Sequence, residues 1–309
     1  MTLGPALVLP PADEAHIMPA PHGLQGAVAG RSLWQDARRR LMRNRAAVAS
    51  MIVLSVFVLA VLFGPYFVEW PYGQVNKGDV WMPPLTGGHL LGTDALGRDL
   101  LARLFVGLGV SLLVGLVATL VSLVIGLTYG AVAGYAGGRV DEIMMRIVDV
   151  LYSLPFMFFV ILLMVTFGKY FVLVFVAIGA VEWLTMARIV RAQTIALKSR
   201  DFIEAARAAG LRKRAILMRH IAPNLLGPVV VYVTLTIPGV ILAESFLSFL
   251  GLGVQEPRTS LGTLINDGAN EMELALWTLV FPALTMVLTL MSFNFLGDGL
   301  RDALDPKDR

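Results

Sequence analysis

Six apolar runs, each long enough to cross a membrane as a helix, alternate with shorter polar segments along the chain. The hydrocarbon core of a bilayer is about 30 Å thick, and a helix that rises about 1.5 Å per residue needs about 20 apolar residues to cross it. The pattern therefore predicts an all-α membrane protein with six transmembrane helices. The runs lie at 46–68, 104–133, 150–168, 170–187, 221–243 and 274–297.

Two features of these runs predict how the helices are placed. The run at 104–133 is uncharged over 30 residues, about 45 Å as a helix, so we expect it to tilt or to project from the bilayer. Lys169 leaves almost no loop between the third and fourth runs, which predicts a tight hairpin. Prolines interrupt the later runs and are expected to bend their helices, because each removes a backbone hydrogen bond: they are Pro155, Pro228, Pro238 and Pro282.

The composition excludes several classes of protein. Of the 309 residues, 57% are apolar and 15% are charged, whereas soluble domains are about 25% charged. The chain has no cysteine, which excludes a disulfide, a thiolate metal site and a cysteine nucleophile. Its four histidines are scattered and lack the spacing of metal-ligand motifs. We therefore expect neither a metal site nor a cofactor bound by this chain.

The N-terminal 45 residues divide into two segments. Residues 1–30 contain no Lys or Arg and are rich in Ala, Pro and Gly, which predicts a flexible cytoplasmic tail rather than a signal peptide. Residues 31–45 are strongly basic and directly precede the first run. We expect them to form a helix on the anionic membrane surface, with three apolar side chains turned toward lipid: Leu33, Trp34 and Leu41. Residues 46–309 then form the six-helix domain.

Basic residues predict the orientation of the chain in the membrane. If the N-terminus lies inside, twenty of the 25 Lys and Arg residues fall on the cytoplasmic side. Cytoplasmic segments of membrane proteins carry an excess of Lys and Arg, so we expect both termini in the cytoplasm. The positive charge then reflects topology, and we expect no nucleic-acid partner.

A polar island between the fourth and fifth runs is expected to form two short helices on the cytoplasmic side. Asp201 is placed to cap a helix over 202–209, with Glu204 reaching back to it. Gly210 stands where a left-handed residue ends such a helix, and a second helix runs from 211 until Pro223 stops it. A short helix held across the cytoplasmic face of a membrane protein suits docking to a soluble partner.

Small residues recur every four positions along the second run. They form a stripe where another helix can approach closely, because small side chains at this spacing share one helix face. We interpret the stripe as a packing face rather than a functional site. Its members are Ala118, Ser122, Gly126, Gly130 and Gly134.

Ionisable residues at membrane depth are functional candidates, because a charge in hydrocarbon is costly. Glu182 is the deepest of them in the sequence. It either lines the path of a substrate or pairs with a neighbouring helix. Asp149 and Glu244 lie at the ends of runs, where we expect them at the membrane interface.

The segment before the second run carries the polar residues Asp94, Arg98 and Asp99. Thr93 or Asp94 is expected to cap the helix that becomes the second span. Two carboxylates five residues apart, with Gly97 between them, are a weak signal for a metal or acid–base site. We therefore expect a capped loop with an ion pair to Arg98.

The island resembles the EAA loop of permeases from ATP-binding-cassette (ABC) importers. The matching positions are Glu204, Ala205, Ala206, Gly210, Ile221 and Pro223. Ala222 departs from the pattern, which usually has a larger aliphatic residue before the proline.

The segments 92–94 and 97–99, Gly-Thr-Asp and Gly-Arg-Asp, resemble the peptide and nickel branch of these permeases. That branch usually has an arginine near the start of the second span, and residues 107–109 lack it, so no role of that arginine carries over. Further segments are similar to the C-subunit family of oligopeptide permeases, and together the resemblance covers 31–309. They are 31–40, 155–161, 244–253 and 294–306.

The resemblance implies a type I ABC importer permease fold in the bacterial inner membrane. It implies a heterodimer with a homologous B-type permease, two cytoplasmic ATPases of the D and F types, and a periplasmic oligopeptide-binding protein. The ATPases would dock on residues 202–210, starting at Phe202, within a cytoplasmic coupling loop at 191–224, and would use ATP and Mg²⁺. The chain itself has no phosphate-binding GxxxxGK[ST] loop, so we expect it to be no enzyme.

The implied function is the movement of oligopeptides across the inner membrane into the cytoplasm. A dipeptide or nickel ABC permease is the alternative within the same branch. A secondary transporter working alone would be expected to show inverted repeats with broken helices and paired midplane charges. An embedded enzyme would need a reactive set of side chains within a span. The sequence shows neither pattern.

Overall fold

The computed structural model describes residues 33–168 and 170–304, and within them the chain forms helices joined by loops, in agreement with the all-α prediction. The N-terminal tail predicted at 1–30 lies outside the described residues. The helices are α1 (Leu33–Arg43), α2 (Arg45–Phe63), α3 (Leu100–Ala136), α4 (Gly138–Ser153), α5 (Phe156–Phe167), α6 (Phe171–Lys198), α7 (Asp201–Ala208), α8 (Lys213–Ile216), α9 (Ala222–Phe249), α10 (Leu261–Glu271) and α11 (Trp277–Leu304), with a 3₁₀ turn η1 (Gly64–Tyr66) and a π-helical turn η2 (Leu217–Ile221).

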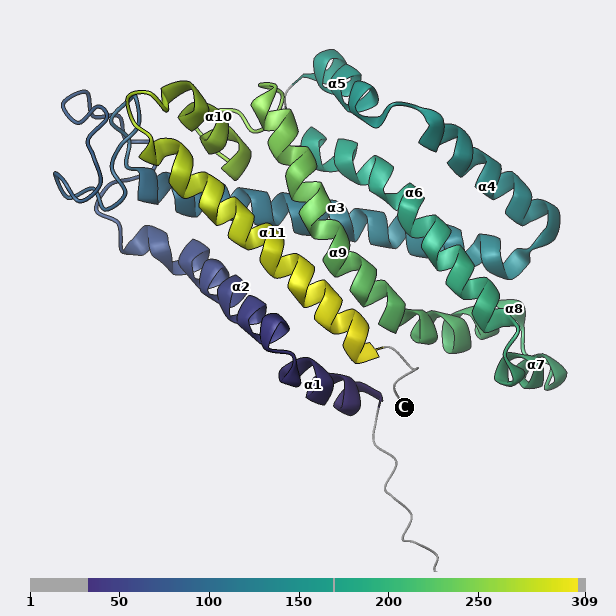
Figure 1. The fold of residues 1–309 in the computed structure, drawn as a ribbon. Coiled ribbons are helices and arrows are strands. Elements are labelled where there is room, and N and C mark those ends of the chain that lie inside the picture. Colours follow the sequence, from purple (N-terminus) through teal and green to yellow (C-terminus); the bar gives the residue numbers. More distant parts are fainter. Residues whose placement is uncertain (1–32, 169, 305–309) are drawn as a thin grey trace, which may run out of the picture.

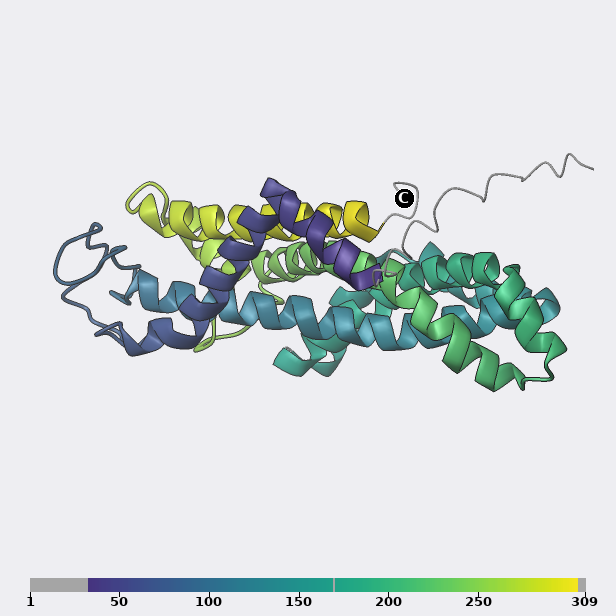
Figure 2. The same cartoon turned by 90° about the horizontal axis from the view of Figure 1, so that it is seen from below.

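The long helices lie side by side in an elongated, flat bundle (Figures 1 and 2). The loop at 67–99 lies at one end of the bundle and α7 lies at the other (Figure 1). Helix α3 has 37 residues and is about 55 Å long, which exceeds the thickness of the hydrocarbon core, so it must tilt or extend beyond it. It is therefore the element that links the two ends.

Length and hydropathy identify four helices that can each cross a membrane. A fifth span results if α4 and α5, which are bent by 76° relative to each other, are counted as one broken helix. The described residues thus form a multi-pass membrane protein, and the count of six spans stays a prediction. The four single spans are Arg45–Tyr66, Leu100–Ala136, Lys213–Phe249 and Trp277–Leu304.

The third apolar run is not one straight helix. Its first residues belong to α4, and α5 begins only after Leu154 and Pro155. Proline cannot donate a backbone hydrogen bond and its ring clashes with the preceding turn, so the bend predicted at Pro155 is confirmed. The chain continues as helix through the other three prolines: Pro228 and Pro238 in α9 and Pro282 in α11.

Pro223 does not end a helix, so this part of the prediction is wrong. The helix that starts at Lys213 passes through η2 and continues as α9 to Phe249. Pro223 lies in the first turn of α9, directly after the wider π-helical turn. The first turn of a helix needs no N–H from a proline, and η2 therefore lets the chain continue.

Helices α3 and α6 make the most extensive contact in the bundle. The small-residue stripe of α3 is buried there. A Cβ added to Gly126 would lie 2.5 Å from the Cβ of Met186, and one added to Gly134 would lie 2.7 Å from the carbonyl oxygen of Arg191. The two backbones therefore approach too closely for any larger side chain on this face.

The basic helix α1 packs against α11. A Cβ added to Gly299 of α11 would lie 3.2 Å from a methyl carbon of Leu41. Leu41 thus contacts α11, because the glycine leaves room for it, and its expected contact with lipid stays a prediction. The basic residues of α1 still form a charged surface beside the first span.

Candidate functional site

Helix α7 is short and amphipathic and lies at the end of the bundle far from the 67–99 loop (Figure 1). Ile203 and Ala206 are buried on one of its faces. Phe202, Glu204 and Ala205 are exposed on the other, with 43% of Phe202 accessible. One face of the helix is thus exposed while its other face is held by the bundle.

The buried face of α7 belongs to an apolar cluster that includes several helices. Ile203 and Ala206 are members of it, together with side chains from α3, α6 and the segment that leads into α9. Because close-packed interiors have low compressibility, this cluster joins α7 firmly to α3, α6 and α9. The contributing residues from those elements include Ala131, Val190, Ile216, Ile221 and Leu225.

The two ends of α7 differ in how well the sequence predicted them. The backbone of Gly210 has a φ of +77°, the left-handed conformation that the sequence indicated. Asp201 is the first residue of the helix and not its cap, and Arg200, the residue before it, makes no side-chain capping bond. The predicted cap is therefore wrong. Asp201 and Glu204 instead place negative charge in the first turn, where the helix dipole favours it.

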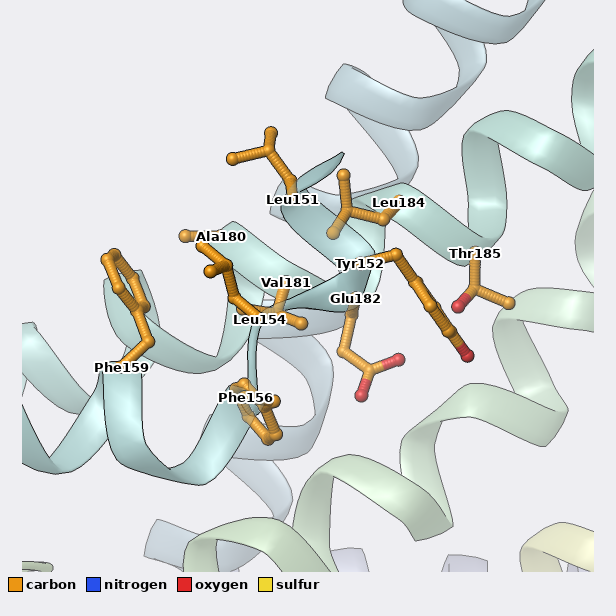
Figure 3. Close-up of a pocket in the computed structure, with 10 residues that line it drawn as sticks. All are labelled: Leu151, Tyr152, Leu154, Phe156, Phe159, Ala180, Val181, Glu182, Leu184 and Thr185. Carbon is orange, nitrogen blue, oxygen red and sulfur yellow. The ribbon is translucent and has the colours of Figure 1, made fainter. Parts of the chain in front are cut away.

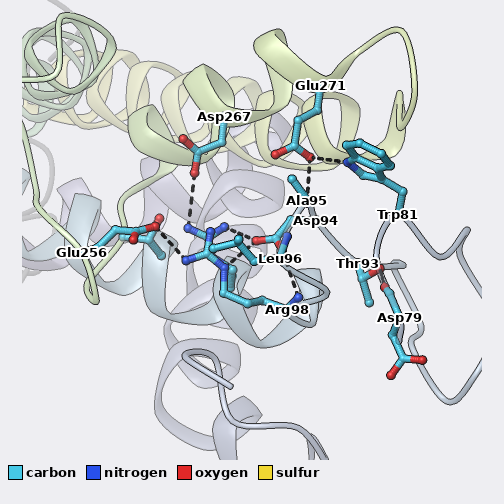
Figure 4. A network of polar contacts seen from close by, with 12 residues as sticks. Asp79, Trp81, Thr93, Asp94, Ala95, Leu96, Arg98, Glu256, Asp267 and Glu271 are labelled. Atoms are coloured by element: carbon cyan, nitrogen blue, oxygen red, sulfur yellow. Dashed lines mark hydrogen bonds and ion pairs between the residues drawn. The ribbon is translucent and has the colours of Figure 1, made fainter. Parts of the chain in front are cut away.

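A buried polar network, centred on Asp94, holds the 67–99 loop in place (Figure 4). The carboxylate of Asp94 accepts hydrogen bonds from the guanidinium groups of Arg98, at 2.7 Å, and Arg103. Arg98 also donates to Glu256 at 2.7 Å, and Arg103 donates to Asp267 of α10 at 3.3 Å. The network therefore joins the 67–99 loop and α3 to segments more than 150 residues away in the sequence.

Burial and the neighbouring arginines together leave the pKa values of two acids of this network shifted in opposite directions. Burial alone would raise the pKa of Asp94, but Arg103 and Arg98 outweigh it and hold that pKa below its ordinary value. At Asp267 burial dominates and raises the pKa, although Arg103 opposes the shift. Asp94 is the acid that contacts both arginines.

The predicted ion pair between Asp94 and Arg98 is confirmed, but the predicted helix cap is not. The residue that caps α3 is Asp99, whose carboxylate accepts a hydrogen bond from the backbone N–H of Ala102 at 2.8 Å. Asp94 cannot take this role because its carboxylate is already bound to the arginines and to backbone N–H groups of its own loop. Arg103 joins the network across the fold, and no spacing in the sequence indicates its partner Asp267.

Glu244 lies inside the bundle, and its expected place at the membrane interface stays a prediction. It is fully buried in α9. Its carboxylate accepts hydrogen bonds from Ser111 of α3, at 3.2 Å, and from Ser248, at 2.6 Å. Buried polar groups need such partners, and the serine hydroxyls supply them. These hydrogen bonds tie α3 to α9.

Glu182 lines a cavity of about 390 Å³ between α6 and the bend that separates α4 from α5 (Figure 3). The next basic residue of α6, Arg188, pairs with Asp149 of α4 at 2.9 Å. Its guanidinium group also lies 4.2 Å from the centre of the Tyr152 ring. The sequence left open whether Glu182 pairs with a neighbouring helix. Among the described residues, Glu182 forms no ion pair with another helix.

The fold defines a class: a multi-pass helical membrane protein with one short amphipathic helix exposed at the end of its bundle. The family model of the binding-protein-dependent transport system inner membrane component matches residues 126–309. The model of the N-terminal TM domain of oligopeptide transport permease C matches residues 32–84. The chain belongs to the family of inner membrane components of binding-protein-dependent transport systems.

Three curated relatives show how far the similarity extends. The oligopeptide transport system permease protein OppC of Escherichia coli K12 is 56% identical over 283 residues, which cover 91% of this chain and 94% of the relative. OppC of Haemophilus influenzae is 54% identical over 281 residues, 91% and 90% of the two chains. The dipeptide transport system permease protein DppC of Bacillus subtilis is 45% identical over 280 residues, 90% and 87% of the two chains.

Proposed function

We propose that this chain is the C-type permease subunit of an ATP-driven importer that moves oligopeptides across the inner membrane into the cytoplasm. Its family membership and its apolar spans support a role in the membrane-embedded part of a transporter. Two relatives named for oligopeptide transport are 54–56% identical to it, above the 45% of the dipeptide permease of Bacillus subtilis, although OppC of that organism is 42% identical. We therefore propose oligopeptides as the substrate, with dipeptides and nickel as the alternatives.

The other subunits follow from the same proposal. A homologous B-type permease completes the path, two ATPases of the D and F types hydrolyse ATP with Mg²⁺, and a periplasmic oligopeptide-binding protein delivers the peptide. This chain contributes no ATPase site of its own. The excess of basic residues on one side supports a cytoplasmic position for α7 and both termini, where the proposed ATPases would bind.

The anchored amphipathic helix α7 carries the mechanism. Its exposed residues Phe202, Glu204 and Ala205 form the docking surface for the ATPases, and Gly210 sets the turn that follows. When the ATPases close, they displace α7, and the apolar cluster under Ile203 passes the displacement to α3, α6 and α9. The cavity then opens outward, and Glu182 lines the peptide path.

Peptide uptake in strains with single substitutions tests the proposal. Cells without this subunit are expected to lose uptake of radiolabelled oligopeptides with varied side chains, and to keep uptake of free amino acids and nickel. Complementation with Phe202→Ala or Glu204→Lys should restore the subunit to the membrane but not restore uptake, and the ATPases should no longer co-purify. Met218→Ala is the matched control, because Met218 is 64% exposed nearby but lies outside α7.

Two outcomes would contradict the proposal. Normal peptide uptake in the deletion strain, with loss of nickel uptake, would assign the chain to the nickel alternative. Undiminished uptake and normal co-purification in both α7 variants would show that α7 is only a connector between α6 and α9.

A further inference from the structure

The pocket beside Glu182 offers hydrogen-bond acceptors without a cation. Only three of its ten lining residues have polar side chains: Glu182, Tyr152 and Thr185. The carboxylate of Glu182 points into the pocket (Figure 3). Among the described residues, it makes no hydrogen bond or ion pair. A carboxylate in largely apolar surroundings is costly unless a donor or cation pairs with it.

The nearest basic side chain of the same helix is already committed to other partners. Arg188 forms its ion pair with Asp149 and stacks on the ring of Tyr152. Tyr152 lines the pocket as well, so the arginine fixes one wall while its charge is balanced elsewhere. The negative charge of Glu182 is therefore left for a group that enters the pocket.

The position and size of the pocket suit one end of an extended ligand. It lies where the backbone between α4 and α5 breaks, and non-helical backbone at membrane depth is tolerated where it lines a cavity. Its volume of about 390 Å³ is near the lower end of the range of about 300–1,000 Å³ for ligand sites. It can hold a terminal residue of a peptide and not a whole oligopeptide.

We propose that this pocket binds the N-terminal ammonium group of the transported peptide, with Glu182 as its counter-ion. The inference rests on the proposed function. Peptides of every sequence share only their backbone and their two charged ends, so a site for varied peptides must recognise one of these. The acceptors of Glu182, Tyr152 and Thr185 suit the positive end. The apolar wall formed by Leu154, Phe156 and Phe159 accepts the first side chain without a polar requirement.

A reporter cysteine can measure occupancy of the pocket, because the chain has no cysteine of its own. Ala180→Cys places the reporter on a partly exposed residue of the lining. The assembled transporter carrying it is reconstituted in nanodiscs, without the binding protein, and maleimide labelling is followed with and without nucleotide. The probes are one tripeptide with a free amino terminus and the same tripeptide N-acetylated.

The free tripeptide is expected to slow labelling several-fold in at least one nucleotide state, and the acetylated tripeptide is expected to leave it unchanged. Glu182→Gln, added to the reporter, should abolish the difference between the two probes. Glu142→Gln is the matched control, since Glu142 is an exposed carboxylate on α4 outside this pocket, and it should preserve the difference.

Equal protection by both tripeptides, or a difference that survives Glu182→Gln, would overturn the inference. Loss of the second permease from the purified Glu182→Gln complex would also overturn it, by showing that Glu182 is a subunit contact. The comparison of the free and the acetylated tripeptide on the Ala180→Cys transporter tests the site even if the Glu182→Gln variant fails to assemble. Peptide uptake by the wild-type transporter is measured in parallel: its absence defeats the proposed function, whereas uptake without amine-dependent protection defeats only this inference.

Discussion

The two ends of the bundle are held by contacts of different kinds. At the end that carries the 67–99 loop, Asp94 and Arg103 are almost fully buried and bonded to each other, and their network reaches α10. At the other end, α7 is held by apolar side chains such as Ile203, and within the described residues none of the ion pairs includes a residue of α7. Charged hydrogen bonds demand a fixed geometry, whereas apolar contacts are not directional.

This difference suits a fixed loop at one end and, under the proposed function, a movable α7 at the other. A displacement of about 1 Å would break the charged hydrogen bonds around Asp94, because hydrogen bonds weaken steeply with distance and angle. The same displacement of α7 breaks no ion pair among the described residues, so α7 can move together with the apolar side chains packed beneath it. The network around Asp94 therefore resists movement, whereas the apolar cluster is the route by which we propose that a movement of α7 reaches α3, α6 and α9.

The largest expected effect concerns the sides of the membrane on which the two ends lie. Lys77 and Arg212 are both exposed, the first in the 67–99 loop and the second beside α7. Lys77→Cys should label completely with a membrane-impermeant maleimide in cells with a permeabilised outer membrane, and Arg212→Cys should label only after lysis. Labelling of both from outside would place the two ends on one side and remove the basis of the comparison.

The next largest effect is expected for Asp94→Asn. The substitution leaves Arg98 and Arg103 without their shared carboxylate, and removing one partner of a buried pair costs about 3–5 kcal/mol. We expect the free energy of unfolding in detergent to fall by this amount. Glu256→Gln is the control, since the side chain of Glu256 is 61% exposed and such pairs contribute about 0–1 kcal/mol. Equal effects of the two variants would contradict a network centred on Asp94.

The pH dependence of unfolding gives this prediction a sign. Because the folded pKa of Asp94 is held below the ordinary value of 3.8, its contribution is fully present above that pH. It is lost only as the pH falls through the lowered pKa. The difference between wild type and Asp94→Asn should therefore be constant from pH 7 down to about pH 5 and shrink only in stronger acid.

A smaller effect on stability is expected for Ile203→Ala at the other end. Loss of a buried isoleucine side chain costs about 2–5 kcal/mol in a core, and we expect about 2 kcal/mol because α7 is peripheral and its surroundings can close. Hydrogen exchange should rise in α7 and stay unchanged around Asp94, while peptide-stimulated ATP hydrolysis falls. Phe202→Ala should lower ATPase docking without raising exchange. Identical behaviour of the two variants would argue against separate anchoring and docking faces.

The smallest effect is expected at Gly210. A Cβ there would meet no atom within 4 Å, so only the left-handed backbone resists substitution. Gly210→Ala should cost about 1 kcal/mol of local stability, and Gly210→Val more, with a matching loss of coupling. Gly210→Asn should be nearly neutral, because asparagine tolerates this conformation. A loss of transport as large for Asn as for Val would mean that the glycine is needed for contact and not for its backbone.

The sequence by itself determined the helical class, the apolar spans and the position of the short helix α7. Each follows from local chemistry: runs of about 20 apolar residues must leave water, Pro155 breaks its helix, and Gly210 allows the turn after α7. The stripe around Gly126 lies against α6 for the same reason, because residues four apart share one face of a helix.

Only the tertiary structure decided the partners of the charged residues and the continuity of the later helices. Arg103 and Asp267 are 164 residues apart, and no periodicity links positions at such a distance. Glu244 stands at the end of a run in the sequence, yet it is buried in the packed bundle, where Ser111 of α3 donates a hydrogen bond to it. The local sequence predicts that Pro223 ends a helix, but the π-helical turn before it allows the helix to continue. Local patterns determine elements, whereas the pairing of buried charges depends on which elements the packed fold brings together.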